Sequence, residues 1–370
     1  MNSFEKYAKM LSLEPYSDRR EIPVFPHMIT TLAPIAGYTQ AEVFDDVDKW
    51  LDALDKTIEV VGTFDVSCVV NPADTVFIEG MKSRRPGYEL DDDASFQFVE
   101  TPDFDDPETE YPRIMEMGWE AWYGEHLMKI QNPPLTNPAQ LQARFGQFAQ
   151  NAQKGAMHAV QRGMVPWFEN AVMPIFDMLW LIRSMEEFVM DLYDDPGIIM
   201  DIVNKYQPIE DEKAIAMMKQ AGMTRVATFP MRDSATFMST DMFEEYSWPW
   251  MKDSISRYAE AGLTTIIHAD GNWLPMLPYF LELPRGCCHF ELDGVTDIEK
   301  AYDILRGHHS IRGDVPATIL AFGTEDETRE YCEKLVTMGM GGGFMLSSGC
   351  EVPINAKLEN LKAFVNFLKD

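Results

Sequence analysis

Positive charge is scarce in this sequence of 370 residues. Lys and Arg together number 31, whereas Asp and Glu number 60, so the formal net charge at pH 7 is −29. Proteins that bind nucleic acid, polyphosphate or an anionic membrane surface use clustered Lys and Arg side chains. The composition therefore argues against all three kinds of partner, and we attribute most of the acidity to a solvated surface.

Long hydrophobic runs and paired cysteines are also lacking. No apolar stretch approaches the roughly 20 residues that a transmembrane helix needs, so we expect no membrane span. The five cysteines are an odd number scattered along the chain, and residues 1–4 do not begin a secretory signal. We therefore expect a cytoplasmic protein whose thiols stay reduced.

A glycine-rich phosphate loop is missing after the first predicted strand. The three consecutive glycines at residues 341–343 precede a strand instead of following one, so they indicate a turn and not a dinucleotide cradle. This weakens the case for an open, doubly wound sheet, which remains the alternative architecture.

Short apolar segments rich in β-branched residues alternate with helical patterns along the whole chain. Capping boxes mark several helices, such as the one that begins at Thr39 and that we expect to continue to Val61. The eight strands predicted in this way begin near residues 22, 66, 164, 225, 264, 287, 309 and 343. Strict alternation is typical of parallel sheets, and eight units predict an α/β fold of the (β/α)8 TIM barrel type. We expect one domain over residues 1–370.

Two segments fall outside the repeating pattern. A short helical extension precedes the first strand, and an irregular insertion occupies residues 80–137. The insertion carries Trp119 and Trp122 and is expected to include a small sheet. Long loops inside compact enzymes are often lids or binding loops. The tryptophans equally suit an anchor that fixes the insertion to the body of the protein.

The most distinctive strand end is the run from His268 to Gly271. A buried strand there delivers an imidazole and, two residues later, the carboxylate of Asp270 just before a glycine turn. In β/α barrels the working residues lie at the C-terminal ends of strands. Cys350 follows the last predicted strand, so these three side chains can form a zinc site with an open fourth position. From spacing alone, a hydrogen-bonded His268 and a simply buried Cys350 remain the alternative.

Other strand ends add side chains that we expect to assist catalysis or bind substrate. Asp233 is expected to join His268, Asp270 and Cys350 as a catalytic residue. The expected substrate-binding residues are His27, Met28, Asp74, Trp119, Trp167, Glu291 and Asp314. Polar residues are common wherever a strand meets a loop, so this set rests on the barrel architecture.

Two adjacent pairs, Cys287-Cys288 and His308-His309, are better explained without a metal. Successive residues on a strand point to opposite faces, so the two thiols are not expected to share a tetrahedral site. We expect the cysteines in the core and the histidines at the entry to a strand.

The second half of the chain resembles the uroporphyrinogen decarboxylase superfamily, and within it most closely the corrinoid-dependent methyltransferases. The resemblance is carried by His-Ala-Asp-Gly-Asn at 268–272, Ser-Ile-Arg-Gly-Asp-Val-Pro at 310–316, Gly-Thr-Glu-Asp-Glu-Thr at 323–328, Gly-Gly-Phe-Met-Leu-Ser-Ser-Gly-Cys-Glu-Val-Pro at 342–353 and Leu-Glu-Asn-Leu at 358–361. It is strong over residues 224–370 and weaker, but continuous in layout, before them. It implies a (β/α)8 barrel, in agreement with the strand count.

Two places separate this chain from the decarboxylase branch. Decarboxylases that resemble the haem-pathway enzyme carry an arginine-rich segment after the first strand, which binds substrate carboxylates. Residues 27–34 occupy that place here and contain no arginine, although Asp74 falls near the position of the decarboxylase aspartate. The late Gly-His-Gly motif of those enzymes is replaced by Ser348-Gly349-Cys350. A decarboxylase is therefore the less favoured alternative.

The zinc methyltransferases that the chain resembles use His-x-Cys followed much later by Gly-Cys. This chain keeps His268 and Cys350 but has Asp270 in place of the first cysteine. The resemblance implies a zinc ion on these three residues, a corrinoid carried by a separate partner protein, and a small methyl donor. A carboxylate leaves more positive charge on zinc than a thiolate does, which suits an oxygen atom as the leaving group.

We therefore expect an O-demethylase that takes a methyl group from a donor such as a methoxylated aromatic compound. Asp233, Glu291 and Asp314 are expected to orient the substrate, protonate the leaving oxygen or act as alternative zinc ligands. The tryptophans at 119, 122 and 167 are expected to pack against an aromatic ring or a quaternary ammonium group. A methyl-corrinoid:thiol methyltransferase, which usually shows two cysteines in the site, and a catalytically silent binding protein are further alternatives.

Overall fold

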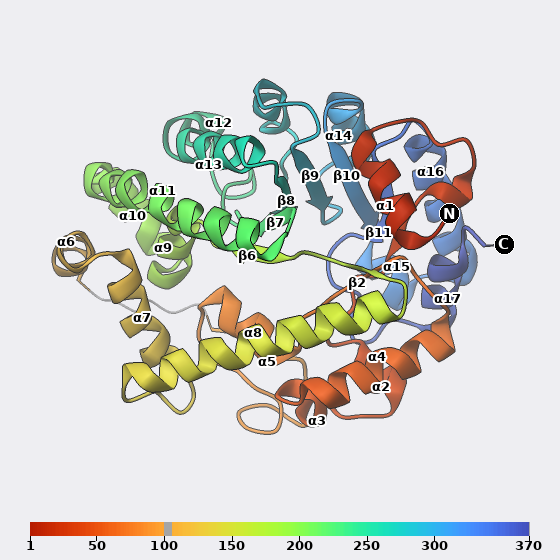
Figure 1. Ribbon diagram of the computed structural model, residues 1–370, viewed down its shortest axis with the longest axis horizontal. Helices are drawn as coiled ribbons and strands as arrows, with labels where there is room; N and C mark the ends of the chain where they lie inside the picture. Colours follow the sequence, from red (N-terminus) through yellow and green to blue (C-terminus); the bar gives the residue numbers. More distant parts are fainter. Residues whose placement is uncertain (100–105, 370) are drawn as a thin grey trace.

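A parallel sheet of seven strands forms the centre of the molecule (Figure 1). The computed structural model describes residues 1–99 and 106–369. The strands follow one another in the order β1-β11-β10-β9-β8-β7-β6. Their bounds are β1 Val24–Phe25, β6 Asn170–Val172, β7 Arg225–Thr228, β8 Thr264–Ala269, β9 Cys288–Leu292, β10 Ser310–Val315 and β11 Phe344–Ser348. Strands β7 to β11 are buried over almost their whole length because both faces of a parallel sheet are covered.

A shorter pair of strands connects the two edges of this sheet. Strand β2 (Val66–Ser67) pairs in parallel with β5 (Val165–Pro166), and β5 leads within a few residues into β6 at the sheet edge. On the other side, the Asp65 N–H donates to the Val24 carbonyl over 2.9 Å and so joins β2 to β1. The chain therefore has a TIM-barrel-like fold, and the predicted fold class is confirmed. The predicted strand near residue 164 is the one divided between β5 and β6.

Helices follow the strands and cover the outside of the sheet, as Figure 1 shows. The longer ones after the first strands are α4 Val47–Val61, α8 Pro138–Gln161, α9 Ile175–Arg183, α10 Met185–Asp194 and α11 Pro196–Ala221. Those of the later units are α13 Trp248–Glu260, η3 Leu277–Glu282, α14 Ile298–Leu305, α15 Ala317–Phe322, α16 Glu325–Gly339 and α17 Leu358–Asn366. None of the helices in the described ranges 1–99 and 106–369 combines the length and the apolar character that a membrane crossing requires.

The first helical region differs from the expected continuous helix between Thr39 and Val61. Two helices occupy it, α3 (Gln40–Phe44) and α4, with α2 (Leu32–Ala36) before them. The chain breaks because Asp46 adopts an extended backbone and its side chain accepts the Lys49 N–H over 3.0 Å, which begins a new helix. Asp46 is therefore a second helix cap within the apolar repeat, and the hydrophobic periodicity alone does not reveal it.

The insertion contains the small sheet that the sequence predicts. Strands β3 (Ser83–Arg84) and β4 (Gln97–Phe98) pair antiparallel, and helices α6 (Pro107–Met117) and α7 (Trp119–Ile130) follow. Residues 100–105, which also belong to the predicted insertion, lie outside the described residues. In α7, Trp119 and Trp122 are buried, and the Trp119 ring stacks on Tyr123 with ring centroids 5.1 Å apart. The tryptophans thus serve as an anchor of the insertion.

Asp65 ties the N-terminal extension to the junction of β1 and β2. Its carboxylate accepts the Val24 N–H over 2.9 Å and the Ser3 hydroxyl over 2.9 Å, and it pairs with Lys6 over 3.1 Å. Ser3 and Lys6 belong to α1 (Ser3–Ser12), so one carboxylate holds a helix and a strand edge together. The Asp65 side chain thus supplies a hydrogen bond to the backbone of β1, which at two residues makes few hydrogen bonds to neighbouring strands.

Replacing Asp65 with Ala should lower the free energy of unfolding by about 1–3 kcal/mol, because the buried Val24 N–H would lose its acceptor. Asp65→Asn is the matched control. It keeps an acceptor oxygen and should lose less, mainly the ion pair with Lys6. Urea titration of the three proteins measures the difference, and equal losses in both variants would contradict the role given to Val24.

Candidate functional site

Three side chains from two distant strand ends meet at the mouth of the barrel. His268 lies near the end of β8, Asp270 follows that strand, and Cys350 follows β11. His268 Nε2 is 3.5 Å from Asp270 Oδ1 and 3.8 Å from Cys350 Sγ. One ligand atom from each residue lies within 4.8 Å of the other two. Such an arrangement of nitrogen, oxygen and sulfur can hold a single metal ion.

The curvature of the sheet makes this meeting possible. Strands β8 and β11 are separated by β9 and β10 in the sheet order. With neighbouring strands about 4.8 Å apart, a flat sheet would hold their ends roughly 14 Å from each other. The barrel-like closure turns the side chains at both strand ends toward a common axis, so the His268–Cys350 contact is a consequence of the tertiary fold.

Glu291 fixes the orientation of the His268 ring. It lies opposite His268 in the register of β8 and β9, and its Oε2 is 2.9 Å from His268 Nδ1. A carboxylate only accepts, so the hydrogen-bond network places the imidazole N–H on Nδ1 and leaves Nε2 to face Asp270 and Cys350. Metal-binding histidines are oriented in this way by a carboxylate behind the ring.

Glu291 is in turn held by a buried arginine and a tryptophan. Its Oε1 forms an ion pair with Arg312 Nε at 2.8 Å and accepts the Trp167 indole N–H over 2.5 Å. Arg312 is fully buried and also donates to the Ser347 hydroxyl over 2.6 Å. Burial alone would favour a protonated Glu291, but the Arg312 charge and the His268 hydrogen bond hold the pKa of Glu291 well below its usual range. The residue is a permanent anion that supports His268.

The charge of His268 is set by competing effects. Burial disfavours the imidazolium, yet the Asp270 carboxylate and the hydrogen bonds with Asp270, Cys350 and Glu291 outweigh it and raise the pKa of His268 well above its usual value. The same contact lowers the pKa of Asp270 against the effect of its own burial. Without a metal, His268 is therefore protonated and lies between the carboxylates of Asp270 and Glu291. Its positive charge takes the place that a metal cation would occupy.

The turn after β8 fixes Asp270. Gly271 has φ +83°, and a side chain there would collide with Ser234 and Thr236. Its N–H donates to Asp293 Oδ2 over 2.8 Å. This turn, which directly follows Asp270, therefore requires glycine at position 271.

Aromatic rings line the side of the site next to His268. The His27 and Trp167 ring centroids are 4.3 Å apart, and the Phe229 ring centroid is 5.6 Å from that of His268. Burial and the nearby Arg312 charge keep the pKa of His27 well below its usual value, so this imidazole is neutral. Met28, the other predicted residue of the loop after β1, is buried beside it. The wall suits a flat, uncharged ring.

Glu79, which sequence analysis did not single out, is close enough to the cluster for the His268 and Asp270 charges to affect its pKa. It ends α5 (Pro72–Glu79), and burial raises its pKa to about 7, with the His268 charge opposing and the Asp270 charge adding to the shift. Helix α7 closes over this helix end, because the Tyr123 hydroxyl fills the space that a side chain at Gly80 would need. A glutamate at the end of an ordinary helix carries no sequence signal of this environment.

Three predicted carboxylates are engaged elsewhere. Asp74 binds α8 through Arg144 at 2.7 Å and Asn151 at 2.9 Å. Asp314 accepts the Tyr331 hydroxyl of α16 over 2.9 Å, and burial raises its pKa to about 7. Asp233 lies buried beside Asp177. None of them makes a hydrogen bond or ion pair with His268, Asp270 or Cys350 among the described residues.

Asp233 and Asp177 form a buried carboxyl pair. Both oxygens of Asp233 lack a hydrogen-bond partner among the residues the structure describes, as does Oδ2 of Asp177. Burial raises the pKa of Asp233 to about 7, and burial together with the Asp233 charge raises that of Asp177 well above its usual value. At least one proton is therefore held between them at neutral pH. The pair belongs to the packing of the loop after β7 on α9.

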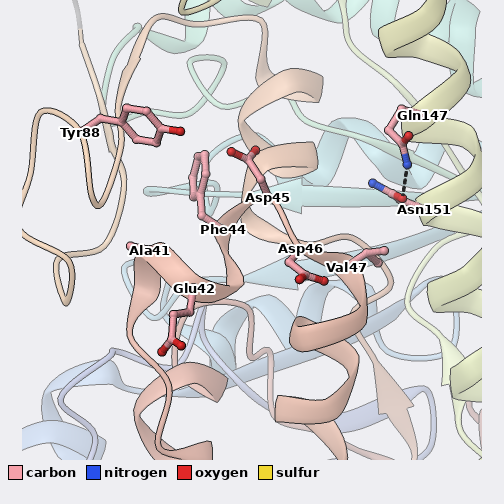
Figure 2. A pocket seen from close by; sticks show the side chains of 9 residues that line it. All are labelled: Ala41, Glu42, Phe44, Asp45, Asp46, Val47, Tyr88, Gln147 and Asn151. Atoms are coloured by element: carbon pink, nitrogen blue, oxygen red, sulfur yellow. Dashed lines mark hydrogen bonds between the residues drawn. The ribbon is translucent and has the colours of Figure 1, made fainter.

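A separate cavity of about 450 Å³ opens between the start of α4 and α8 (Figure 2). Its lining includes Phe44, Asp45, Asp46 and Tyr88 on one side and Asn151 on the other. None of its lining residues belongs to the His268 cluster. The candidate site at the strand ends is therefore separate from this cavity.

Together, these features define a β/α-barrel protein with a His-Asp-Cys cluster at the C-terminal mouth of the strands. The chain belongs to the uroporphyrinogen decarboxylase (URO-D) family, whose model matches residues 117–370. Among solved structures it is similar to a methyltransferase from Methanosarcina mazei, with 15% sequence identity, a TM-score of 0.65, and coverage of 100% of this chain and 98% of that chain. At this identity the likeness concerns the fold. No curated protein matches the sequence.

The Asp233–Asp177 pair leads to a pH-dependent prediction. The pKa of Asp233 is about 7 in the folded state and near its ordinary value of 3.8 when unfolded, so the folded protein binds more protons and its stability falls as pH rises from about 4 to 7. Asn cannot ionise, so Asp233→Asn should remove the part of this dependence that Asp233 contributes, leaving the smaller part due to buried Asp177, and should be more stable than wild type at pH 8 by on the order of 2 kcal/mol.

Thermal unfolding at several pH values measures this difference. The exposed Asp303→Asn is the control and should follow the wild-type curve. If Asp233→Asn is less stable than wild type at every pH, the Asp233 carboxylate must be ionised and hydrogen-bonded in the folded state, which would contradict the prediction.

Proposed function

We propose that this protein is a corrinoid-dependent methyltransferase. It takes a methyl group from a small O-methyl donor, with methoxylated aromatic compounds favoured, and passes it to a corrinoid carried by a separate protein. The observation that carries the proposal is the convergence of His268, Asp270 and Cys350 within 4.8 Å at the mouth of a URO-D family barrel. The solved structure of similar fold named a methyltransferase supports the same class of reaction.

The three residues fit a catalytic zinc ion. Zinc accepts nitrogen, oxygen and sulfur ligands, and catalytic sites use three protein ligands with the fourth position open. The fit is supported by Glu291, because its bond to Nδ1 leaves His268 Nε2 directed at the other two ligands. When bound there, zinc would act as a Lewis acid toward the heteroatom that loses the methyl group.

Asp270 favours an oxygen leaving group over a thiol. A hard carboxylate in place of a thiolate leaves more positive charge for an oxygen ligand. Activation of a thiol acceptor usually relies on two cysteines, and Cys350 is the only cysteine within the His-Asp-Cys cluster. The neutral wall of His27, Trp167 and Phe229 can pack against the ring of a methoxylated aromatic donor.

Glu79 replaces the carboxylates expected from the sequence as the proton donor. Glu291 is held as an anion by Arg312, whereas Glu79 is half-buried and has a pKa of about 7. A general acid works best when its pKa lies near the working pH. Glu79 can therefore hold a proton near neutral pH and give it to the oxygen that leaves the methyl group.

A uroporphyrinogen-type decarboxylase is the second candidate because of the family to which the chain belongs. The loop after β1 argues against it. Glu351 accepts the N–H groups of Ile29 and Thr30 over 3.3 and 2.5 Å. Backbone amides that could bind a substrate carboxylate there already bind a carboxylate of the protein, and the loop carries no arginine. Release of CO2 from uroporphyrinogen by the purified protein would favour the decarboxylase instead.

Metal content is the first test of the proposal. Protein purified without added zinc should contain zinc, and His268→Ala and Cys350→Ala should each lower the affinity of the His-Asp-Cys cluster for zinc at least about tenfold, because one of its three protein ligands is lost. Both variants should also lose methyl transfer from a methoxylated aromatic compound to a corrinoid protein. Wild-type protein that transfers methyl groups without any metal would contradict the proposed role of the cluster.

The role of Glu79 can be tested by pH. Glu79 has a pKa of about 7, so it is protonated and can act as an acid below pH 7 but is ionised above it. Wild-type turnover should therefore fall as pH rises through 7. Glu79→Gln should lower turnover by about 100-fold or more and remove this fall. Zinc content should stay unchanged, which separates proton donation from metal binding. An unaltered pH profile would assign the proton to another group.

A further inference from the structure

A second group of metal-ligating side chains lies at the opposite ends of the strands. Cys287 directly precedes β9, Cys288 begins it, and His309 directly precedes β10. One ligand atom from each lies within 4.8 Å of the others, and all three residues are buried. The group is separate from the His268 centre, whose residues lie at the C-terminal ends of β8 and β11.

The two cysteines approach each other although alternation along a strand predicts opposite faces. The alternation does not apply, because β9 begins only at Cys288 and Cys287 belongs to the preceding turn, where its N–H donates to the Pro284 carbonyl over 3.2 Å. The two Sγ atoms are 3.6 Å apart. Two thiolates bound to one zinc ion at about 2.3 Å and at tetrahedral angles would be about 3.8 Å apart. The thiols thus already have the separation that one ion requires.

His309 has the tautomer of a metal ligand. Its Nε2 lies 2.9 Å from the Phe280 carbonyl, which can only accept, so the ring proton is on Nε2. Its Nδ1 has a free lone pair and no hydrogen-bond partner among the described residues, although His309 is only 1% exposed. Burial lowers the pKa of His309 to about 4, so the ring is neutral. A buried, unpartnered acceptor is unfavourable unless something binds it.

The neighbouring histidine does not supply this partner. His308 Nε2 lies 2.9 Å from the Leu283 carbonyl, and its ring stands nearly perpendicular to that of His309. The Gly286 N–H donates to the His308 carbonyl over 2.7 Å, which joins the turn before β9 to the turn before β10. The backbone thus holds the two turns together and keeps a ring nitrogen of His309 within 4.8 Å of both sulfur atoms.

We propose that Cys287 Sγ, Cys288 Sγ and His309 Nδ1 form a structural site for a thiophilic d10 metal ion, Zn²⁺ or Cu⁺. Thiolate and imidazole ligands select these ions over Mg²⁺ or Ca²⁺. Binding replaces two S–H bonds by sulfur–metal bonds and releases both protons to solvent, while neutral His309 contributes its lone pair. The ion would cross-link the starts of β9 and β10 at the end of the barrel whose residues serve stability.

The site can be tested apart from the proposed catalytic centre. The double variant His268→Ala, Cys350→Ala removes two ligands of that centre and serves as the background. This background protein should still bind one equivalent of zinc, or of Cu⁺ under anaerobic reducing conditions. Co²⁺ added in place of zinc should give thiolate charge-transfer absorption. Cys288→Ala or His309→Gln should weaken binding at least tenfold, whereas Cys332→Ala, which removes another buried thiol, should leave it unchanged.

A second measurement needs no change at the site. Removing the ion from the folded background protein with a chelator should lower Tm, and adding it back should restore Tm. The site is overturned if the background protein binds neither ion, if Cys332→Ala weakens binding as much as Cys288→Ala, or if Cys287 and Cys288 are found joined in a disulfide in reduced preparations.

Discussion

The buried carboxylate of Glu291 is the interaction on which the candidate active site depends. It bonds to His268 on β8, to Arg312 on β10 and to Trp167 after β5, and so connects side chains from four parts of the barrel. Each of these bonds restricts a different group. The first bond orients the His268 ring. The second gives the fully buried Arg312 a counter-charge, and the third gives the Trp167 indole N–H an acceptor.

Stability alone does not explain this arrangement. Burying an ion pair removes two charges from water, and well-packed apolar residues in its place are often as stable or more so. An ionised carboxylate that orients the His268 ring gives a functional reason for the pair under the proposed role of the cluster. The Arg312 charge supplies that ionisation, and the serines of β11 hold Arg312 in place. The chain of contacts therefore runs from β11 through β10 and β9 to His268.

The two ends of the strands carry different chemistry. At the C-terminal mouth, the carboxylates of Asp270 and Glu291 and the thiol of Cys350 lie around His268, and aromatic rings line one side. At the N-terminal ends, two thiols and one unpartnered imidazole nitrogen meet in a small apolar setting. The predicted carboxylates Asp74 and Asp314 are also close to strand ends, but each is taken by a helix packed on the barrel, Asp74 by α8 and Asp314 by α16.

The sequence by itself determined the order of strands and helices, the barrel type and the His268-Asp270-Cys350 set, because hydrophobic periodicity and strand-end position are local properties. It also indicated the insertion and its small sheet. It did not reveal the break between α3 and α4 or the approach of Cys287 to Cys288, since both depend on where one element begins. Only the tertiary structure decided that β8 and β11 curve toward one another, that Arg312 pairs with Glu291, that Glu79 is buried near the His268 and Asp270 charges, and that Asp233 lies beside Asp177. These are contacts between residues far apart in the chain, and their chemistry depends on burial, which no local pattern encodes.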